Sequence, residues 1–145
     1  RVYPTLDYAL TRFRFMPPQT CANLYIADYI ARHALKEVPA GDGHDAGWTW
    51  RFDPFLWRGY QGSNPGADLQ AARCPVALMR GSRSGLADDD SYAYARSLAP
   101  AGSPSVEIPD ADHHVMVDQP LAFAAALQGL LAGWPRCHVR RVNRP

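Results

Sequence analysis

The sequence contains little that would stabilise a secreted protein or bind a metal ion. Its three cysteines, Cys21, Cys74 and Cys137, are widely spaced and form no CxxC pair or Cys/His ligand spacing. An odd and sparse set of thiols is typical of a cytosolic protein and not of a small domain held by disulfides. We therefore expect a cytoplasmic protein with reduced cysteines and no metal or other cofactor.

A strong charge of one sign and long apolar runs are also missing. The net charge of +1 gives no field that would favour nucleic acid or a membrane as partner. No apolar run reaches the ~18 residues of a spanning helix, and the opening residues RVYPTLDYAL lack the apolar core of a signal peptide. The composition, 47% hydrophobic and 20% charged over 145 residues, is that of one globular domain. Because the first residue is arginine and not methionine, we expect the chain to be part of a longer protein.

The first 57 residues predict a mainly helical region. Leucines at helical spacing within residues 5–15 predict a first helix, which the prolines of MPPQ end. Residues 21–38 carry apolar side chains on one stripe that reaches Val38, and this spacing predicts an amphipathic helix. In WTWRFDP, apolar and polar side chains alternate from Trp48 to Asp53, which predicts a short half-buried strand or an extended arm.

The second half predicts a strand, a helix, a strand and a helix in that order. The apolar run of CPVALMRG is typical of a strand buried on both faces, and SVEIPDAD predicts a second strand. Between them, DDDSYAYARSLA predicts a helix with carboxylates in its first turn. QPLAFAAALQGLLAGW then predicts an apolar helix that begins at a proline. This order with short connections is that of βα units, so we expect an α/β fold with two parallel strands.

Two adjacent histidines, His113 and His114, lie just past the end of the second predicted strand. Functional side chains gather at the carboxyl ends of parallel strands. A histidine in this position can act as a base, bind a metal or be a solvated loop residue. Metal binding through Asp112, His113 and His114 is disfavoured, because neighbouring histidines project differently and the other histidines show no ligand spacing with them.

The two loops and the order of elements resemble the C-terminal part of an α/β-hydrolase. In that fold the penultimate core strand ends in a glycine followed by an acidic loop, which PVALMRGSRSGLADDD matches. The last strand leads to the catalytic histidine, with an acid five residues later and a proline two further on. DHHVMVDQP fits this spacing at His113, Asp118 and Pro120. The resemblance implies that His113 is the general base, since His114 has its acid only four residues away.

The resemblance also divides the chain into parts. Residues 1–57 are similar to the C-terminal part of a helical lid or cap, and residues 58–66 form a connection. Residues 67–134 are similar to the C-terminal part of the hydrolase core. Residues 135–145 carry four arginines without a helix signal, and we expect a disordered tail there. The implied fold class is α/β: a partial α/β-hydrolase fold with its last two parallel strands, flanking helices and a helical lid segment.

The sequence offers no nucleophile for His113. The nucleophile elbow of these hydrolases is G-x-S-x-G, with the serine in the middle. The similar-looking RGSRSG has Arg83 in the middle, between Gly81 and Gly85, and no other segment fits the pattern. In the family the elbow precedes the lid, so we expect the nucleophile upstream of these residues.

The acid that would orient His113 is not identified by the sequence. Relatives often carry aspartate three or four residues after the strand-ending glycine, where this chain has Ser84 and Gly85. The three aspartates at residues 88–90 come later and are typical of a helix start. Asp118 could brace the histidine loop, but a place in the first turn of the last helix is the simpler interpretation. An acid on an upstream strand is a further alternative.

Two hypotheses about function follow from these patterns. In the first, the complete protein is a cofactor-free hydrolase acting on an ester-like or other small hydrophobic substrate, with His113 as general base. In the second, it is a non-catalytic binding or relic protein that keeps part of the fold, as the vacant acid position suggests. The expected partner is a small molecule, neither nucleic acid nor a membrane, and the sequence leaves the oligomeric state open.

Overall fold

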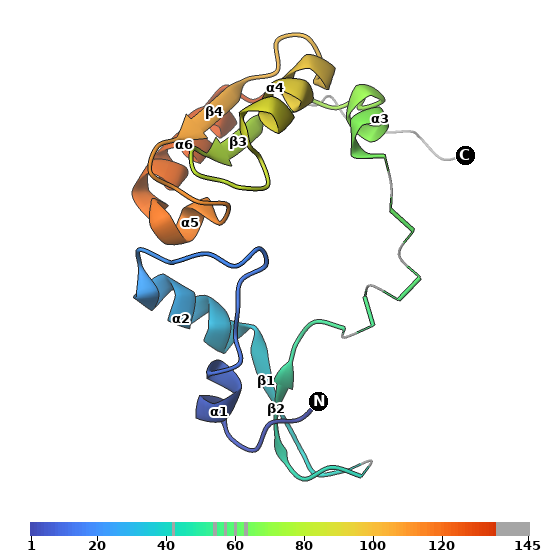
Figure 1. The fold of residues 1–145 in the computed structure, drawn as a ribbon, viewed down its shortest axis with the longest axis vertical. Coiled ribbons are helices and arrows are strands. Elements are labelled where there is room, and N and C mark those ends of the chain that lie inside the picture. Colours follow the sequence, from blue (N-terminus) through green and yellow to red (C-terminus); the bar gives the residue numbers. More distant parts are fainter. Residues whose placement is uncertain (42, 54, 57, 60, 63, 136–145) are drawn as a thin grey trace, which may run out of the picture.

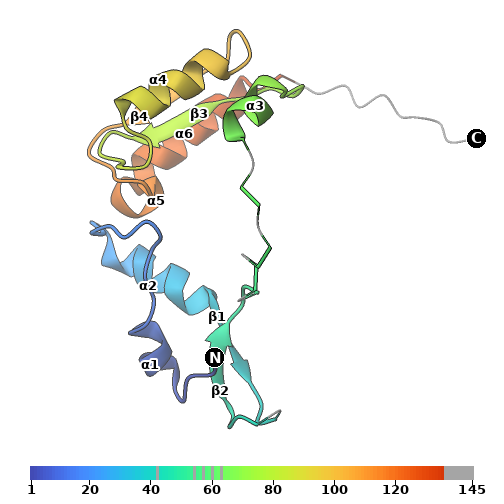
Figure 2. The ribbon, with the colours of Figure 1, turned by 45° about the vertical axis from the view of Figure 1, so that its right-hand side comes forward.

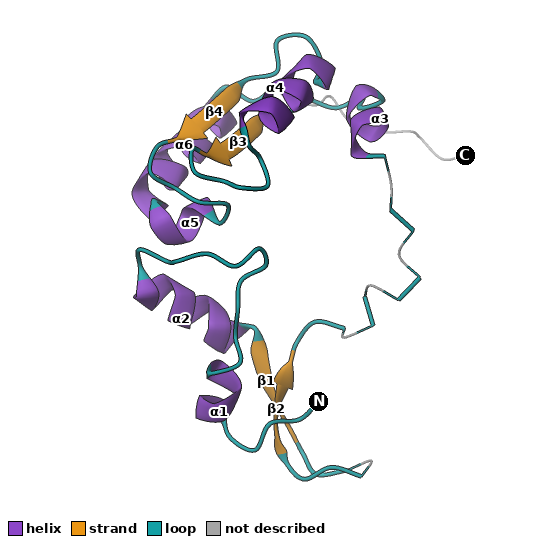
Figure 3. Ribbon diagram, viewed as in Figure 1, coloured by secondary structure: helices purple, strands orange, loops and turns teal. Residues whose placement is uncertain are grey.

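The computed structural model describes residues 1–135 except 42, 54, 57, 60 and 63. The chain forms two units, one above the other in Figure 1, which we call the N-terminal unit (residues 1–53) and the C-terminal unit (residues 64–134). Figure 3 shows that each unit contains one pair of strands. The domain boundaries predicted above stay predictions, and the tail from residue 136 lies outside the described residues.

The N-terminal unit consists of two helices and a hairpin. Its helices are α1 (Leu6–Leu10) and α2 (Leu24–His33). The strands β1 (Leu35–Val38) and β2 (Gly47–Trp50) are antiparallel, so that the first residue of β1 lies opposite the last residue of β2. The alternation in WTWRFDP therefore predicted β2 correctly, although the strand ends at Trp50.

A small apolar core holds this unit together. Tyr3, Ala9 and Leu35 are buried at its centre, and Leu35 is only 1% exposed. Tyr3 is also joined to Trp48 by two backbone hydrogen bonds, with N···O distances of 2.7 and 2.8 Å. Gly47 allows this approach, because a Cβ atom there would lie 2.3 Å from the carbonyl oxygen of Tyr3. The chain start is thus fixed to the hairpin.

The helix predicted over residues 21–38 is wrong in its last part. It ends at His33, and residues 35–38 form β1. The apolar residues of this stretch fit a helical stripe, but Leu35 is buried in the core through the hairpin. Pairing with β2 therefore decides the conformation that periodicity alone could not. The predicted helical lid is in fact a mixed α/β segment.

The C-terminal unit contains the predicted parallel strands. They are β3 (Leu78–Gly81) and β4 (Ser105–Ile108), paired in register from Leu78 opposite Ser105 to Gly81 opposite Ile108. Four helices accompany them: α3 (Pro65–Gln70), α4 (Asp89–Leu98), α5 (Val115–Asp118) and α6 (Pro120–Ala132). The mixed α/β class with a small parallel sheet is therefore confirmed.

The two long helices of this unit cover opposite faces of the strand pair. Figure 2 shows α4 on one side of β3 and β4 and α6 on the other. The buried centre, Ile108, Ala111 and Val115, lies where β4 and the following loop meet α6. Phe123 and Ala126 of α6 pack against it. No helix in the described part of the chain is both long enough and apolar enough to cross a lipid bilayer.

The aspartates at the start of α4 have structural partners. The Asp88 side chain caps the helix by accepting a hydrogen bond from the backbone N–H of Ser91 at 2.8 Å. Asp89 pairs with the guanidinium of Arg80, which also pairs with Glu107 and lies over the ring of Tyr92. The predicted role of these aspartates at the helix start is confirmed for both residues.

Candidate active site

The carboxyl ends of β3 and β4 bring two loops into contact. A Cβ atom at Gly81 would lie 2.2 Å from the carbonyl oxygen of Asp112 and 2.3 Å from that of Ala111. The loop after β4 therefore crosses directly over the end of β3, and only a glycine leaves room for it. The backbone N–H of Arg83 donates a hydrogen bond to the carbonyl of Ala111 at 2.9 Å. The two loops therefore lie together at this edge of the sheet, and the functional role of their residues stays a prediction.

His113 and Ser84 meet across these two loops. The Ser84 Oγ lies 3.1 Å from the Nδ1 of His113, within hydrogen-bond distance. Ser84 is 5% exposed, and its Oγ also accepts a hydrogen bond from the backbone N–H of Ala87 at 3.2 Å. The position that the sequence suggested was vacant is thus filled by a hydroxyl that contacts the histidine.

A cavity of about 350 Å³ lies beside this pair. Part of its wall comes from the C-terminal unit and includes His113 and Arg83. The rest comes from the N-terminal unit, so the cavity lies between the two units. The lining residues are Pro17, Pro18, Gln19, Arg83, Gly85, Leu86, Asp112 and His113.

Asp118 is the buried carboxylate of this region. It is 4% exposed, and its Oδ2 accepts a hydrogen bond from the backbone N–H of Asp112 at 2.8 Å. Its Oδ1 accepts another from the N–H of Ala22 at 3.1 Å, and the amide of Gln19 donates to Oδ2 at 3.1 Å. Asp118 therefore braces the histidine loop and also attaches the N-terminal unit. The simpler interpretation of Asp118 as a first-turn residue of the last helix is wrong, because it closes the separate short helix α5.

Gln19 holds the histidine loop from the opposite unit. Its side-chain oxygen accepts a hydrogen bond from the backbone N–H of His114 at 2.7 Å, while its amide nitrogen donates to Asp118. The His114 ring packs on Phe15, with the ring centroids 4.7 Å apart. His113 is thus flanked by two backbone groups, those of Asp112 and His114, that are both fixed by side chains.

Arg83 and Cys21 are two further polar side chains near the site. Arg83 lies close to the carboxylates of Asp110 and Asp112, at 3.7 and 3.6 Å, and its side chain is 54% exposed. Burial, together with the negative charges of Asp118 and Asp112, raises the pKa of the Cys21 thiol. A raised pKa disfavours the thiolate, which is the reactive form of a cysteine, at neutral pH.

The remaining histidines lie away from this site. The His33 Nδ1 is 2.8 Å from the carbonyl oxygen of Tyr29, and the His44 Nδ1 is 2.9 Å from that of Asp45. His138 falls outside the described residues. Within the part of the chain that the structure describes, no three His, Cys, Asp or Glu side chains are grouped so that they could hold a metal ion.

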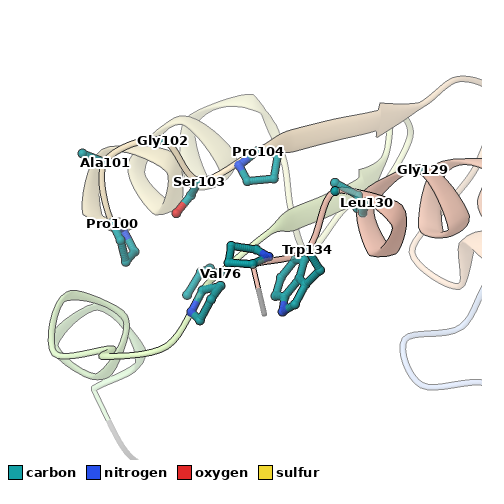
Figure 4. A pocket seen from close by; sticks show the side chains of 12 residues that line it. Val76, Pro100, Ala101, Gly102, Ser103, Pro104, Gly129, Leu130 and Trp134 are labelled. Carbon is teal, nitrogen blue, oxygen red and sulfur yellow. The ribbon is translucent and has the colours of Figure 1, made fainter. Parts of the chain in front are cut away.

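A second cavity, of about 500 Å³, lies at the opposite ends of the same strands. Figure 4 shows Val76, Leu130 and Trp134 around it, together with the turn from Pro100 to Pro104. Its lining contains no ionisable side chain. Although this cavity is larger, it offers no group for acid–base chemistry, and the smaller one beside His113 is the candidate site.

Comparison with known proteins finds a similar fold among solved structures. E-2-(acetamidomethylene)succinate hydrolase, an α/β-hydrolase, matches 91% of this chain with a TM-score of 0.63 and 18% sequence identity. The chain spans about half of that protein, since the match covers 47% of its length. The predicted resemblance to part of an α/β-hydrolase fold is confirmed, and at this identity the likeness concerns the fold alone. No protein-family model matches the sequence, and no curated protein matches it significantly.

Proposed function

We propose that this chain is the C-terminal portion of a cofactor-free α/β-hydrolase in which His113 is the general base. The observation that carries the proposal is the contact between the His113 Nδ1 and the buried Ser84 hydroxyl at the edge of a cavity. A histidine whose Nδ1 is held by a neighbour can present its Nε2 to a reacting group. The fold match to part of a hydrolase supports the same conclusion.

In the proposed reaction His113 moves one proton in each direction. It takes the proton of the nucleophile as the nucleophile attacks the carbonyl carbon of the substrate. It then returns this proton to the leaving group as the bond to the carbonyl carbon breaks. In the second half of the reaction it takes a proton from water, which attacks the bound acyl group, and returns it to the nucleophile as the acid is released. An imidazole suits both steps because its usual pKa lies near neutrality. The nucleophile comes from a part of the protein outside these 145 residues, which is consistent with the 47% coverage of the similar hydrolase.

The proposed substrate is a small molecule, with an ester-like bond or another hydrolysable bond in a mainly hydrophobic framework. The cavity of about 350 Å³ is in the range of small-molecule sites. Pro17, Pro18 and Leu86 supply its apolar wall, and Arg83 its cation. The similar hydrolase is named for an acetamido-substituted succinate, so acetamido acids belong in a substrate panel beside neutral esters.

The test is replacement of His113 by alanine in the full-length protein. We expect the hydrolysis rate of the best substrate in such a panel to fall by at least about 10³-fold. His44→Ala is the matched control, since His44 is an exposed loop histidine whose ring contacts a backbone carbonyl. Near-normal turnover by His113→Ala, with circular dichroism unchanged, would rule out the assignment of His113 as base.

One observation favours the alternative of a non-catalytic binding protein. The neighbour of His113 is a neutral hydroxyl and not a carboxylate, so it gives less stabilisation to a positively charged imidazole. A fluorophosphonate probe separates the two functions, because it labels only an activated nucleophile. Labelling of the full-length protein that disappears in His113→Ala indicates a hydrolase. Absence of both labelling and turnover, with retained binding of a small molecule, indicates a binding protein.

A further inference from the structure

The Ser84 hydroxyl lies 3.1 Å from the Nδ1 of His113. Its hydrogen bond there can decide which ring nitrogen carries the proton. Ser84 is 5% exposed, so water competes little for its hydrogen bonds. Its backbone N–H donates to the carbonyl of Gly81 at 3.1 Å, and its Oγ accepts from Ala87 at 3.2 Å. The first bond fixes the backbone of Ser84, and the second fixes its hydroxyl oxygen beside His113. Such a group can orient a ring.

We propose that Ser84 is a positioning residue for His113, which accepts the Nδ1–H of the imidazole and leaves Nε2 free to act as the base. This inference rests on the proposed function. The Ser84 hydroxyl differs from a carboxylate partner in one respect. A hydroxyl has a proton of its own and could equally donate that proton to Nδ1. In that case the neutral ring would carry its proton on Nε2, and His113 could not accept a proton there.

The chemistry of the catalytic cycle selects between these two arrangements. When His113 has taken a proton, both ring nitrogens are donors. A Ser84 hydroxyl that donates to Nδ1 would then have to turn around, whereas one that accepts from Nδ1 serves both protonation states unchanged. The N–H of Ala87 occupies one lone pair of the Oγ and leaves the second for Nδ1–H. The accepting arrangement uses both lone pairs, points the hydroxyl proton away from Nδ1, and needs no movement of the hydroxyl during the reaction.

Several charged or titratable groups lie near His113 in the two loops that meet at the ends of β3 and β4. Arg83 and Asp112 line the same cavity, and the ring of His114 lies 5.3 Å from that of His113. Gln19 on the N-terminal side is uncharged, and Asp118 acts on the loop through the N–H of Asp112. These groups are common to the wild-type protein and to all variants at position 84. A change in the pH profile among those variants therefore reports the partner at Nδ1.

The tautomer can be read directly by nitrogen-15 NMR of the full-length protein, with the His113 signals assigned from their loss in His113→Ala. We expect the neutral ring to carry its proton on Nδ1. In Ser84→Ala, we expect a mixture of the two tautomers and a five- to tenfold lower kcat/KM, about the effect of one lost hydrogen bond. Ser84→Thr, which keeps the hydroxyl, should restore both. In Ser84→Asp, the acid limb of the pH–rate profile should move to higher pH, because a carboxylate favours the charged imidazole.

Three outcomes would overturn the inference. These are an Nε2–H tautomer in the wild-type protein, an unchanged tautomer in Ser84→Ala, and an unmoved acid limb in Ser84→Asp. If one of the last two appears while His113→Ala is inactive, the proposed function stands and the role of Ser84 fails. An Nε2–H tautomer would count against both Ser84 and the use of Nε2 as the base. If His113→Ala keeps its turnover, the proposed function itself fails. Should Ser84→Ala not fold, the wild-type tautomer and the Ser84→Thr variant still decide the question.

Discussion

The two units of this chain close their small cores in different ways. In the N-terminal unit a hairpin places Leu35 opposite Trp50, and the backbone of Tyr3 pairs with Trp48 beside it. In the C-terminal unit the strands are parallel, so a helix must intervene between β3 and β4. Each of these strands has a single partner within the described residues. The first unit is closed by a hairpin and by the pairing of Tyr3 with Trp48, whereas both outer edges of the parallel pair are unpaired within the described residues.

The contact between the two units differs from both of their cores, because it consists mainly of hydrogen bonds. We call it the joint: Gln19, Ala22 and Asn23 on one side, and Val117 and Asp118 on the other. Asn23 contributes a side-chain N–H to the carbonyl of Val117 at 3.0 Å, in addition to the hydrogen bonds of Asp118. Hydrogen bonds depend on distance and angle, whereas apolar contacts do not fix direction. The comparison teaches that burial shapes each unit, and that directional bonds at the joint place the histidine loop.

The largest expected effect comes from removing the carboxylate at the joint. Asp118→Ala leaves three donors without an acceptor: the backbone N–H groups of Asp112 and Ala22, and the amide of Gln19. We expect the free energy of unfolding to fall by about 4 kcal/mol, since a partly buried donor without a partner costs about 1–2 kcal/mol and three are affected. Urea denaturation measures the change. Hydrogen exchange at Asp112 and Ala22 should accelerate most.

Asp118→Asn is the control for this prediction. The amide has the same shape and keeps one acceptor oxygen, so it should lose clearly less stability than alanine. Equal stability of Asp118→Ala and the wild type, with unchanged exchange at both amides, would contradict the role of Asp118 as the link between the units.

The second prediction compares alanine substitutions at one glycine of each unit, Gly47 and Gly81. Alanine at Gly47 would place Cβ 2.3 Å from a backbone oxygen of Tyr3, and alanine at Gly81 would place it 2.2 Å from that of Asp112. Both substitutions should cost about 3 kcal/mol in the free energy of unfolding, because a backbone must move in each case. Only Gly81→Ala moves the histidine loop. We therefore expect similar losses of stability but a much larger loss of turnover for Gly81→Ala.

Turnover measured under conditions where both variants are folded separates these outcomes. If Gly47→Ala and Gly81→Ala reduce turnover equally, then the position of the histidine loop does not depend on the end of β3. A distortion in either unit would then affect turnover equally, and the site would not depend on the C-terminal unit more than on the N-terminal unit.

The smallest effect is a pH dependence at the cap of α4. Hydrogen bonds from the hydroxyl and the backbone N–H of Ser91 hold the pKa of Asp88 below its usual value. A carboxyl whose folded pKa is lowered stabilises the protein above its unfolded pKa of about 3.9, and this contribution is lost as the pH falls through the folded value. Asp88→Asn should keep the cap but remove this part of the acid dependence.

The measurement is the urea midpoint of the wild type and of Asp88→Asn, followed from about pH 6 to about pH 2, a range that spans the usual aspartate pKa. The difference between the two proteins should shrink as the pH falls. Because Asp88 is exposed and does not line the cavity beside His113, the variant should leave turnover unchanged. A difference that stays constant with pH would show that the carboxylate charge contributes nothing to the cap.

Local patterns in the sequence predicted much of the C-terminal unit. Apolar runs, a helix cap and a proline gave the order of β3, α4, β4 and α6, and the spacing of DHHVMVDQP put His113 in a loop after a strand. These features are readable because their causes lie within a few residues. The helical pattern that continued past His33 failed for the opposite reason, since β1 forms through its pairing with β2.

The partners of the site could not be predicted in the same way. Ser84 was recognised only as a residue in an unexpected place, and its contact with His113 depends on two loops that meet above Gly81. Gln19 gave no signal at all, because a glutamine between a proline pair and a cysteine has no periodicity or motif. Asp118 was assigned to the wrong helix, since its donors come from distant parts of the chain.

The hydrogen bond from His114 to Gln19 also has a consequence for folding. It joins residues 95 positions apart, so the loop that it closes contains most of the chain. Closing so long a loop costs conformational entropy before any contact compensates for it, and contacts of this separation tend to form slowly. The hairpin and the helices can form early from nearby residues. We therefore expect the segment carrying His113 to reach its final shape late in folding, after both units have formed.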